Sequence, residues 1–109
     1  MKSMDFVVSI YAVIKCFPKE EAYGLTSQIQ RATVSIPANI AEGKLRGTDT
    51  EFRRFLLIAF ASGGEVETHL EIARRLGYLD EMGYKGLINT LGEIMRMLNS
   101  LIKKLEAKS

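Results

Sequence analysis

The sequence LTSQIQRATVSIPANIAEG, residues Leu25–Gly43, has the apolar spacing of a helix but contains a proline and only two charged residues. At about 100° per residue, its apolar residues form one stripe, which predicts a core-facing side. The stripe consists of Leu25, Ile29, Ala32, Ile36 and Ile40. The side away from this stripe lacks the lysines and glutamates that a solvent-facing helix normally carries. We therefore predict a central helix whose second face meets another subunit.

A polar stripe runs beside the apolar one along the same predicted helix. Its members are Gln28, Arg31, Ser35, Asn39 and Glu42. One interpretation is a structural polar network or interface, in which Arg31 pairs with a carboxylate across a subunit boundary and Asn39 and Glu42 satisfy loop amides. The alternative is a groove that binds a ligand or an RNA backbone. We favour the structural interpretation, because buried polar residues can fix the register of an oligomer.

Further amphipathic segments flank this helix on both sides. The periodicity predicts helices over about 4–17, 24–43, 48–76 and 80–106. Pro18 ends the first helix, Gly43 is expected to end the second in the left-handed conformation, and Thr48 with Glu51 fits a capping box. Short loops between such helices favour an all-α, antiparallel up-and-down four-helix bundle. We expect one such domain over residues 1–109.

Composition and charge exclude several classes of protein. The single cysteine cannot form an internal disulfide, which fits a reducing compartment. No run of about eighteen apolar residues indicates a membrane span, and the N-terminal residues lack the apolar region of a signal peptide. We therefore expect a cytoplasmic protein with no membrane partner. The net charge of +2 permits nucleic-acid binding where the basic residues cluster, but does not require it.

The sequence predicts no active site. A carboxylate-bridged di-iron bundle requires two Glu-x-x-His motifs and two further glutamates, whereas this chain has one histidine, His69, preceded by Glu65 at four positions. Ser35, Ser62 and Cys16 lack any context that would activate a nucleophile. We expect no catalytic residue, no metal and no cofactor.

Several residue runs together carry a family resemblance. They are Tyr23-Gly24-Leu25, Gln28-Ile29-Gln30-Arg31-Ala32, Ser35-Ile36-Pro37-Ala38-Asn39-Ile40-Ala41-Glu42-Gly43, Phe55-Leu56-x-Ile58-Ala59 and Leu76-Gly77-Tyr78. The chain resembles the four-helix-bundle family of ribosomal intervening-sequence proteins, whose members are named for reading frames inside intervening sequences of bacterial 23S ribosomal RNA genes. The resemblance covers nearly the whole chain. It implies an up-and-down bundle in a ring-like homo-oligomer, a pentamer.

The same resemblance brings in a structurally similar relative, the accessory protein of diversity-generating retroelements. That protein is a basic pentameric barrel that binds RNA and its reverse transcriptase. This chain departs from its family at two places. Gln30 stands where the family often has a second arginine, and Lys44-Leu45-Arg46 replaces a Gly-Arg-like loop. The signature helix thus lacks one basic residue.

A basic cluster surrounds the predicted loop between the second and third helices. Its members, the RNA-binding candidates, are Lys44, Arg46, Arg53 and Arg54. Asp49 and Glu51 lie among them, so one interpretation is an ordinary solvated helix start. The alternative is contact with RNA phosphates, which would add up around a ring and make binding steeply salt-dependent. Without interleaved aromatic residues, such binding would follow backbone and shape.

From these observations we expect a non-catalytic, homo-oligomeric helical bundle that binds RNA or a ribonucleoprotein partner through basic surface. The alternative is an assembly or adaptor protein that acts only through protein–protein contacts and has no nucleic-acid role.

Overall fold

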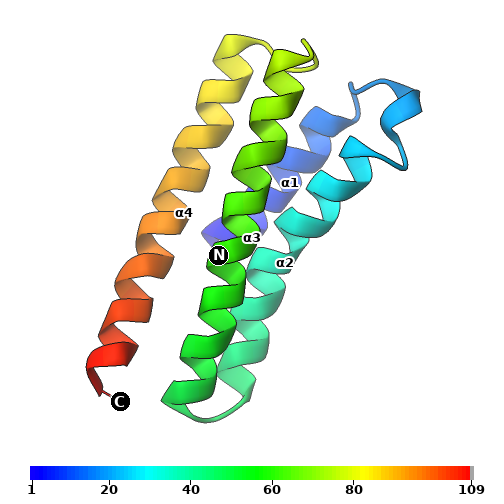
Figure 1. The fold of residues 1–109 in the computed structure, drawn as a ribbon. Helices are drawn as coiled ribbons and strands as arrows, with labels where there is room; N and C mark the ends of the chain where they lie inside the picture. Colours follow the sequence, from blue (N-terminus) through cyan, green and yellow to red (C-terminus); the bar gives the residue numbers. More distant parts are fainter. Residues whose placement is uncertain (109) are drawn as a thin grey trace.

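The computed structural model describes residues 1–108, which form four long helices and one short 3-10 helix (Figure 1). They are α1 (Lys2–Ile14), η1 (Lys19–Glu21), α2 (Leu25–Leu45), α3 (Asp49–Arg75) and α4 (Glu81–Lys108). These residues contain no strand, so the predicted all-α class with four helices is confirmed. The bundle is elongated, measuring 45 × 24 × 19 Å along its principal axes.

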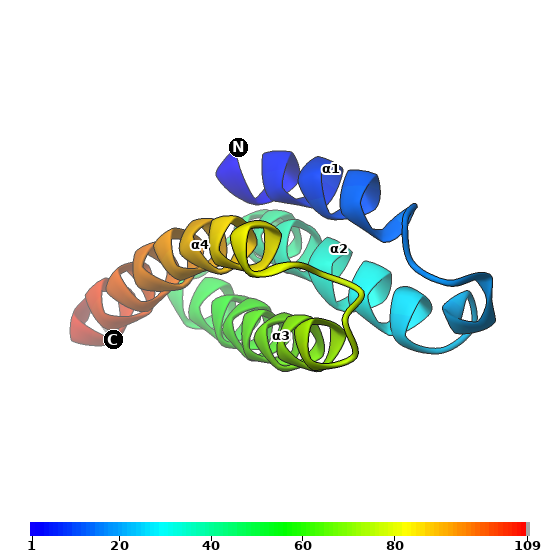
Figure 2. The same ribbon diagram turned by 90° about the horizontal axis from the view of Figure 1, so that it is seen from above.

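Successive helices run in opposite directions and enclose one core. Viewed from above, α1 and α3 lie on opposite sides, with α2 and α4 between them (Figure 2). The most extensive packing joins α2 to α3 and α3 to α4, whereas α1 contacts α2 and α4 but not α3. Among the described residues, no helix is long and apolar enough to cross a membrane.

The core is built from the apolar stripes that the periodicity predicts. Its most deeply buried side chains come from all four helices and are at most 1% exposed. They include Phe6 and Ile10 of α1, Ile29 and Ile36 of α2, Leu56, Val66 and Leu70 of α3, and Leu91, Ile94 and Leu98 of α4. Because each such burial stabilises by about 1.5–3 kcal/mol relative to an exposed side chain, this core needs neither a metal nor a disulfide.

The predicted capping box at the start of α3 is present in part, because Thr48 caps the helix whereas the Glu51 carboxylate contacts Arg54. The Thr48 hydroxyl accepts a hydrogen bond from the Glu51 N–H at 3.2 Å. Asp80 Oδ1 likewise accepts from the Gly83 N–H at 2.7 Å and caps α4. These contacts start α3 and α4 immediately after short connections.

The prediction that Gly43 ends the second helix in the left-handed conformation was wrong. The helix continues to Leu45, and the residue with positive φ is Gly47, at 84°. Gly43 is instead buried in the helix, where a Cβ would lie 2.8 Å from Cβ of Phe55 and 3.3 Å from the carbonyl oxygen of Phe52. A glycine stands there because α3 passes too close for a side chain.

The first helix ends at Ile14, three residues before the expected boundary. The amide that would continue the α-helical bonding beyond this turn belongs to Pro18, which has no N–H. The Ile14 carbonyl accepts from the Phe17 N–H at 3.0 Å instead, which forms a turn. Cys16 therefore lies outside the helix as an exposed free thiol.

Candidate functional site

Parts of three helices meet at the end of the bundle that carries the α2–α3 loop (Figure 1). An ion pair of 3.7 Å between Arg53 and Glu106 joins the start of α3 to the last turns of α4. We call residues 42–54 and 103–107 the basic end. It carries six basic and four acidic residues, a surplus equal to the net charge of +2 of the whole chain. They are Lys44, Arg46, Arg53, Arg54, Lys103 and Lys104, with Glu42, Asp49, Glu51 and Glu106.

The predicted RNA-binding candidates occupy different environments within the basic end. The three arginines have carboxylate partners: Arg46 contacts Glu42 at 3.3 Å, Arg54 contacts Glu51 at 2.9 Å, and Arg53 contacts Glu106. Lys44 makes no ion pair or hydrogen bond through its side chain among residues 1–108. The same holds for Lys103 and Lys104, which sequence reasoning did not assign to this cluster, since only the packing of α4 brings them there.

Two of these arginines are held against one aromatic ring. The guanidinium carbon of Arg46 lies 4.9 Å from the centroid of the Phe55 ring, and that of Arg54 lies 4.6 Å from it. Hydrogen bonding to Arg54 lowers the pKa of Glu51, and the same bond raises the pKa of Arg54. Both guanidinium groups are thus held in place and remain charged, but a carboxylate of the same chain offsets the charge of each.

The predicted polar stripe of α2 lies along α3. The hydroxyl groups of Ser35 and Ser62 are 2.8 Å apart, and Asn39 Nδ2 donates to both the carbonyl oxygen and the hydroxyl of Ser35, each at 2.8 Å. Glu42 pairs with Arg46 one turn further on. The side chains of Gln28 and Arg31 have no polar partner among the described residues. Among the described residues, three of the five stripe side chains therefore have polar partners and two do not.

A shallow groove of about 270 Å³ lies beside this network, between α2 and α3. Its lining includes Arg31, Ser35, Ser62 and Glu65. His69 lies one turn beyond, 17% exposed, with Nε2 3.2 Å from a carboxylate oxygen of Glu65. Elsewhere in residues 1–108, as here, no group of three or more histidine, cysteine, aspartate or glutamate side chains could hold a metal ion.

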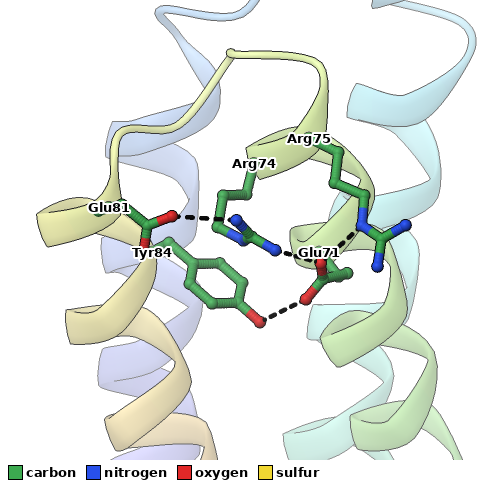
Figure 3. A network of polar contacts seen from close by, with 5 residues as sticks. All are labelled: Glu71, Arg74, Arg75, Glu81 and Tyr84. Atoms are coloured by element: carbon green, nitrogen blue, oxygen red, sulfur yellow. Dashed lines mark hydrogen bonds and ion pairs between the residues drawn. The ribbon is translucent and has the colours of Figure 1, made fainter.

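A second polar network joins α3 to α4 at the other end of the bundle (Figure 3). The Glu71 carboxylate accepts hydrogen bonds from Arg75 Nε at 2.8 Å, from the Tyr84 hydroxyl at 3.0 Å and from Arg74, which also contacts Glu81 at 3.0 Å. Donation from Arg75, Arg74 and Tyr84 lowers the pKa of Glu71 from 4.5 to about 2. This geometry is that of a clamp between two helices.

Large apolar side chains stay exposed on the outer sides of α1, α2 and α3. One such surface, which we call the α1/α2 face, comprises Met4, Val8 and Tyr11 of α1, Lys15 directly after it, and Gln30, Arg31 and Val34 of α2. Two shallow depressions of about 400 and 470 Å³ share Tyr11 on this face. A second surface, which we call the α3 face, comprises Leu57, Ile58, Ala61, Glu65 and Ile72. Apolar surface of this kind is typical of interaction sites.

These features define a small all-helical bundle that presents a basic end and uncovered apolar faces. The chain belongs to the family described as 23S rRNA-intervening sequence protein, which matches residues 1–100. This finding confirms the resemblance that the signature of α2 indicated.

A crystal structure of a protein of unknown function from the S23 ribosomal protein family of Bacteroides thetaiotaomicron has a similar fold. The two chains superpose with a TM-score of 0.87 at 32% sequence identity, over 94% of this chain and 95% of the other. No curated protein matches the sequence. Neither description names a catalytic activity.

Proposed function

We propose that the protein is a non-catalytic, self-associating helical bundle of the cytoplasm that binds RNA or a ribonucleoprotein through its basic end. The observation that carries this proposal is the concentration of the chain's net positive charge on residues 42–54 and 103–107. In a ring-like assembly, a pentamer by family resemblance, this end would recur in every subunit. Phosphate contacts that are weak singly would then add up.

The chemistry of the basic end favours recognition of the RNA backbone. Lys44, Lys103 and Lys104 carry charges without a partner among the described residues. The ring of Phe55 is buried beneath Arg46 and so is not offered to a base for stacking. Binding should therefore follow phosphate charge and RNA shape, with little dependence on sequence.

A second candidate function is that of an adaptor that acts only through protein–protein contacts. Two observations favour it: the three arginines of the basic end already have carboxylate partners, and Val8 and Ile58 are exposed by 70% and 40% on faces without a partner. An adaptor would assemble and capture proteins equally well after RNase treatment.

Fluorescence anisotropy with a labelled RNA hairpin, recorded over a range of salt concentrations, tests the RNA proposal. We expect binding that weakens steeply as salt rises. The triple variant Lys44→Gln, Lys103→Gln, Lys104→Gln should bind about tenfold or more weakly. Its log–log salt slope should fall by about one for each phosphate that the variant no longer neutralises.

A matched control removes the same charge elsewhere on the molecule. The variant Lys19→Gln, Lys85→Gln, Arg96→Gln changes three exposed residues that lie outside the basic end. It should bind like the wild type. Equal losses of affinity in both variants, or no binding by the wild type at low salt, would contradict the proposal and favour the adaptor.

A further inference from the structure

We infer that the guanidinium groups of Arg46 and Arg54 bind a phosphate monoester at the end of an RNA strand. This inference rests on the proposed function and adds which phosphate the arginines of the basic end select. The lysines of the same end contact internal phosphates, whereas these two arginines distinguish a strand end from the interior of a strand.

The two arginines come from different elements but meet at one aromatic ring. Arg46 directly follows α2 and Arg54 lies near the start of α3, and their guanidinium carbons lie 4.9 and 4.6 Å from the centroid of the Phe55 ring. Phe55 is 8% exposed, whereas the arginine side chains are 46% and 54% exposed. The ring therefore holds two guanidinium groups close together at a surface that a ligand can reach.

Glu51 shows that an anion at this place is attracted by both arginines. Its carboxylate accepts hydrogen bonds from Arg54 Nε at 2.9 Å and from Arg54 Nη2 at 3.3 Å. This hydrogen bonding lowers the pKa of Glu51, and the charge of Arg46 adds to the lowering. Arg54 Nη1 has no hydrogen-bond acceptor among the described residues, so an incoming anion can bind before Glu51 leaves.

Charge determines which kind of phosphate can take the place of the carboxylates. Glu42 and Glu51 carry one negative charge each, and so does an internal phosphodiester, so exchanging one for the other gains little. A phosphate monoester carries about −1.5 to −2 charges at pH 7 and three acceptor oxygens. These oxygens suit two planar guanidinium groups, each of which can donate two parallel hydrogen bonds. The monoester is therefore the phosphate that both arginines favour.

Moving the two carboxylates aside should cost little, because both ion pairs are open to water. The side chains of Glu42 and Glu51 are 50% and 36% exposed in their pairs with Arg46 and Arg54, and exposed pairs contribute little to stability. Arg53 has a different role, since its pair with Glu106 joins α3 to α4. We therefore assign the monoester to Arg46 and Arg54 and leave Arg53 as the control.

Fluorescence anisotropy with one RNA hairpin in two forms tests this inference. The hairpin carries its label in the loop and has either a phosphate or a hydroxyl group at its 5′ end. The wild type should bind the phosphate form about fivefold or more tightly. The variant Arg46→Lys, Arg54→Lys keeps the charge but loses the planar guanidinium groups, so the ratio of the two affinities should fall to about one.

Two control variants change the same end of the bundle. Arg53→Lys makes the same chemical change at the neighbouring arginine and should keep the wild-type ratio of affinities. Lys44→Gln should weaken both forms by the same factor and also keep the ratio, since it contacts internal phosphates. Circular dichroism checks that each variant is folded, and the comparison of the two hairpins with the wild type needs no variant.

Two further ligands identify the source of the monoester. A hairpin with a 3′-phosphate extends the test to the other strand end, and an advantage at either end supports the inference. Adenosine monophosphate at about 1 mM should leave the advantage in place, because it lacks the internal phosphates that hold an RNA at the lysines. If it removes the advantage, the site belongs to a free nucleotide and the assignment to an RNA end is overturned.

The outcomes separate this inference from the proposed function. No binding of any hairpin at low salt would overturn the proposed function, and this inference with it. Equal binding of the hydroxyl form and both phosphate forms by the wild type would overturn the inference alone. So would an advantage that persists in the Arg46→Lys, Arg54→Lys variant, because charge without guanidinium geometry would then suffice, or one that is lost in Arg53→Lys.

Discussion

Two helical glycines of this bundle have opposite surroundings. At Gly43, a Cβ would lie 2.8 Å from Cβ of Phe55, whereas a Cβ at Gly86 would have no neighbouring atom within 4 Å. Glycine in a helix interior is otherwise unfavourable by about 0.5–1 kcal/mol relative to alanine. The same residue type is therefore required at one position and dispensable at the other.

Substituting alanine at these two positions should change stability in opposite directions. We expect Gly43→Ala to lower the free energy of unfolding by about 1–3 kcal/mol, because the backbone of Phe52 and the Cβ of Phe55 leave no room. Gly86→Ala should raise it by about 0.5–1 kcal/mol. Urea unfolding measures both, and a stabilised Gly43→Ala variant would show that α3 does not approach as closely as described.

The misplaced helix end at Gly43 shows what local sequence cannot separate. A glycine after an apolar stripe indicates a helix terminus, and a glycine opposite a bulky residue indicates a close crossing of two helices. Only the position of Phe55 distinguishes these cases. By contrast, Gly77 follows the end of α3 with φ of 81°, and a Cβ there would have no neighbouring atom within 4 Å, so its backbone conformation alone favours glycine.

At the scale of elements, the Glu71 network fixes how α3 and α4 meet (Figure 3). The pair with Arg75, at 2.8 Å, follows from helical spacing, because the two residues lie four positions apart in α3. The pair with Arg74 lies at helical spacing too, but the contact of Arg74 with Glu81 and the hydrogen bond from Tyr84 could not be predicted in this way. Tyr84 lies in another helix, and its direction depends on the turn between the two helices.

The depressed pKa of Glu71 makes this clamp sensitive to acid. Because its pKa is about 2 in the folded chain and 4.5 ordinarily, its stabilising effect is complete above pH 4.5 and is lost as the pH falls towards 2. We expect Glu71→Gln to lower the urea midpoint at pH 7 and to match the wild type near pH 2.

Glu67→Gln is the matched control, since Glu67 is exposed on the same helix and lacks an ion-pair partner in the described residues. Its urea midpoint should stay close to that of the wild type at both pH values. A difference between Glu71→Gln and wild type that is the same at pH 7 and pH 2 would contradict the clamp.

At the scale of the whole molecule, the sequence predicted more apolar surface than one bundle buries, and Val34 of α2 is indeed 40% exposed. It could not predict that α1 and α3 would lie on opposite sides of the bundle, because that depends on the order in which the helices pack. The addition of Lys103 and Lys104 to the basic end has the same origin. Periodicity places a residue on a side of its helix, whereas packing decides what that side meets.

The attachment of α1 to one side of the bundle affects how the chain unfolds locally. Helix α1 has 13 residues against 21 to 28 in the others, and it contacts only α2 and α4. Its amides should therefore exchange with deuterium through a local unfolding that leaves α2 and α3 intact.

If the α1/α2 face lies in a subunit contact, association must also suppress the local unfolding of α1. Exchange of the α1 amides should then slow as protein concentration rises, while exchange in α3 stays governed by global unfolding. Hydrogen exchange measured over a dilution series would detect this. Protection of the α1 amides that does not vary with protein concentration would show that α1 packs on its own chain independently of association. Protection that rises with protein concentration would mean that α1 becomes fully folded only in contact with a neighbouring subunit.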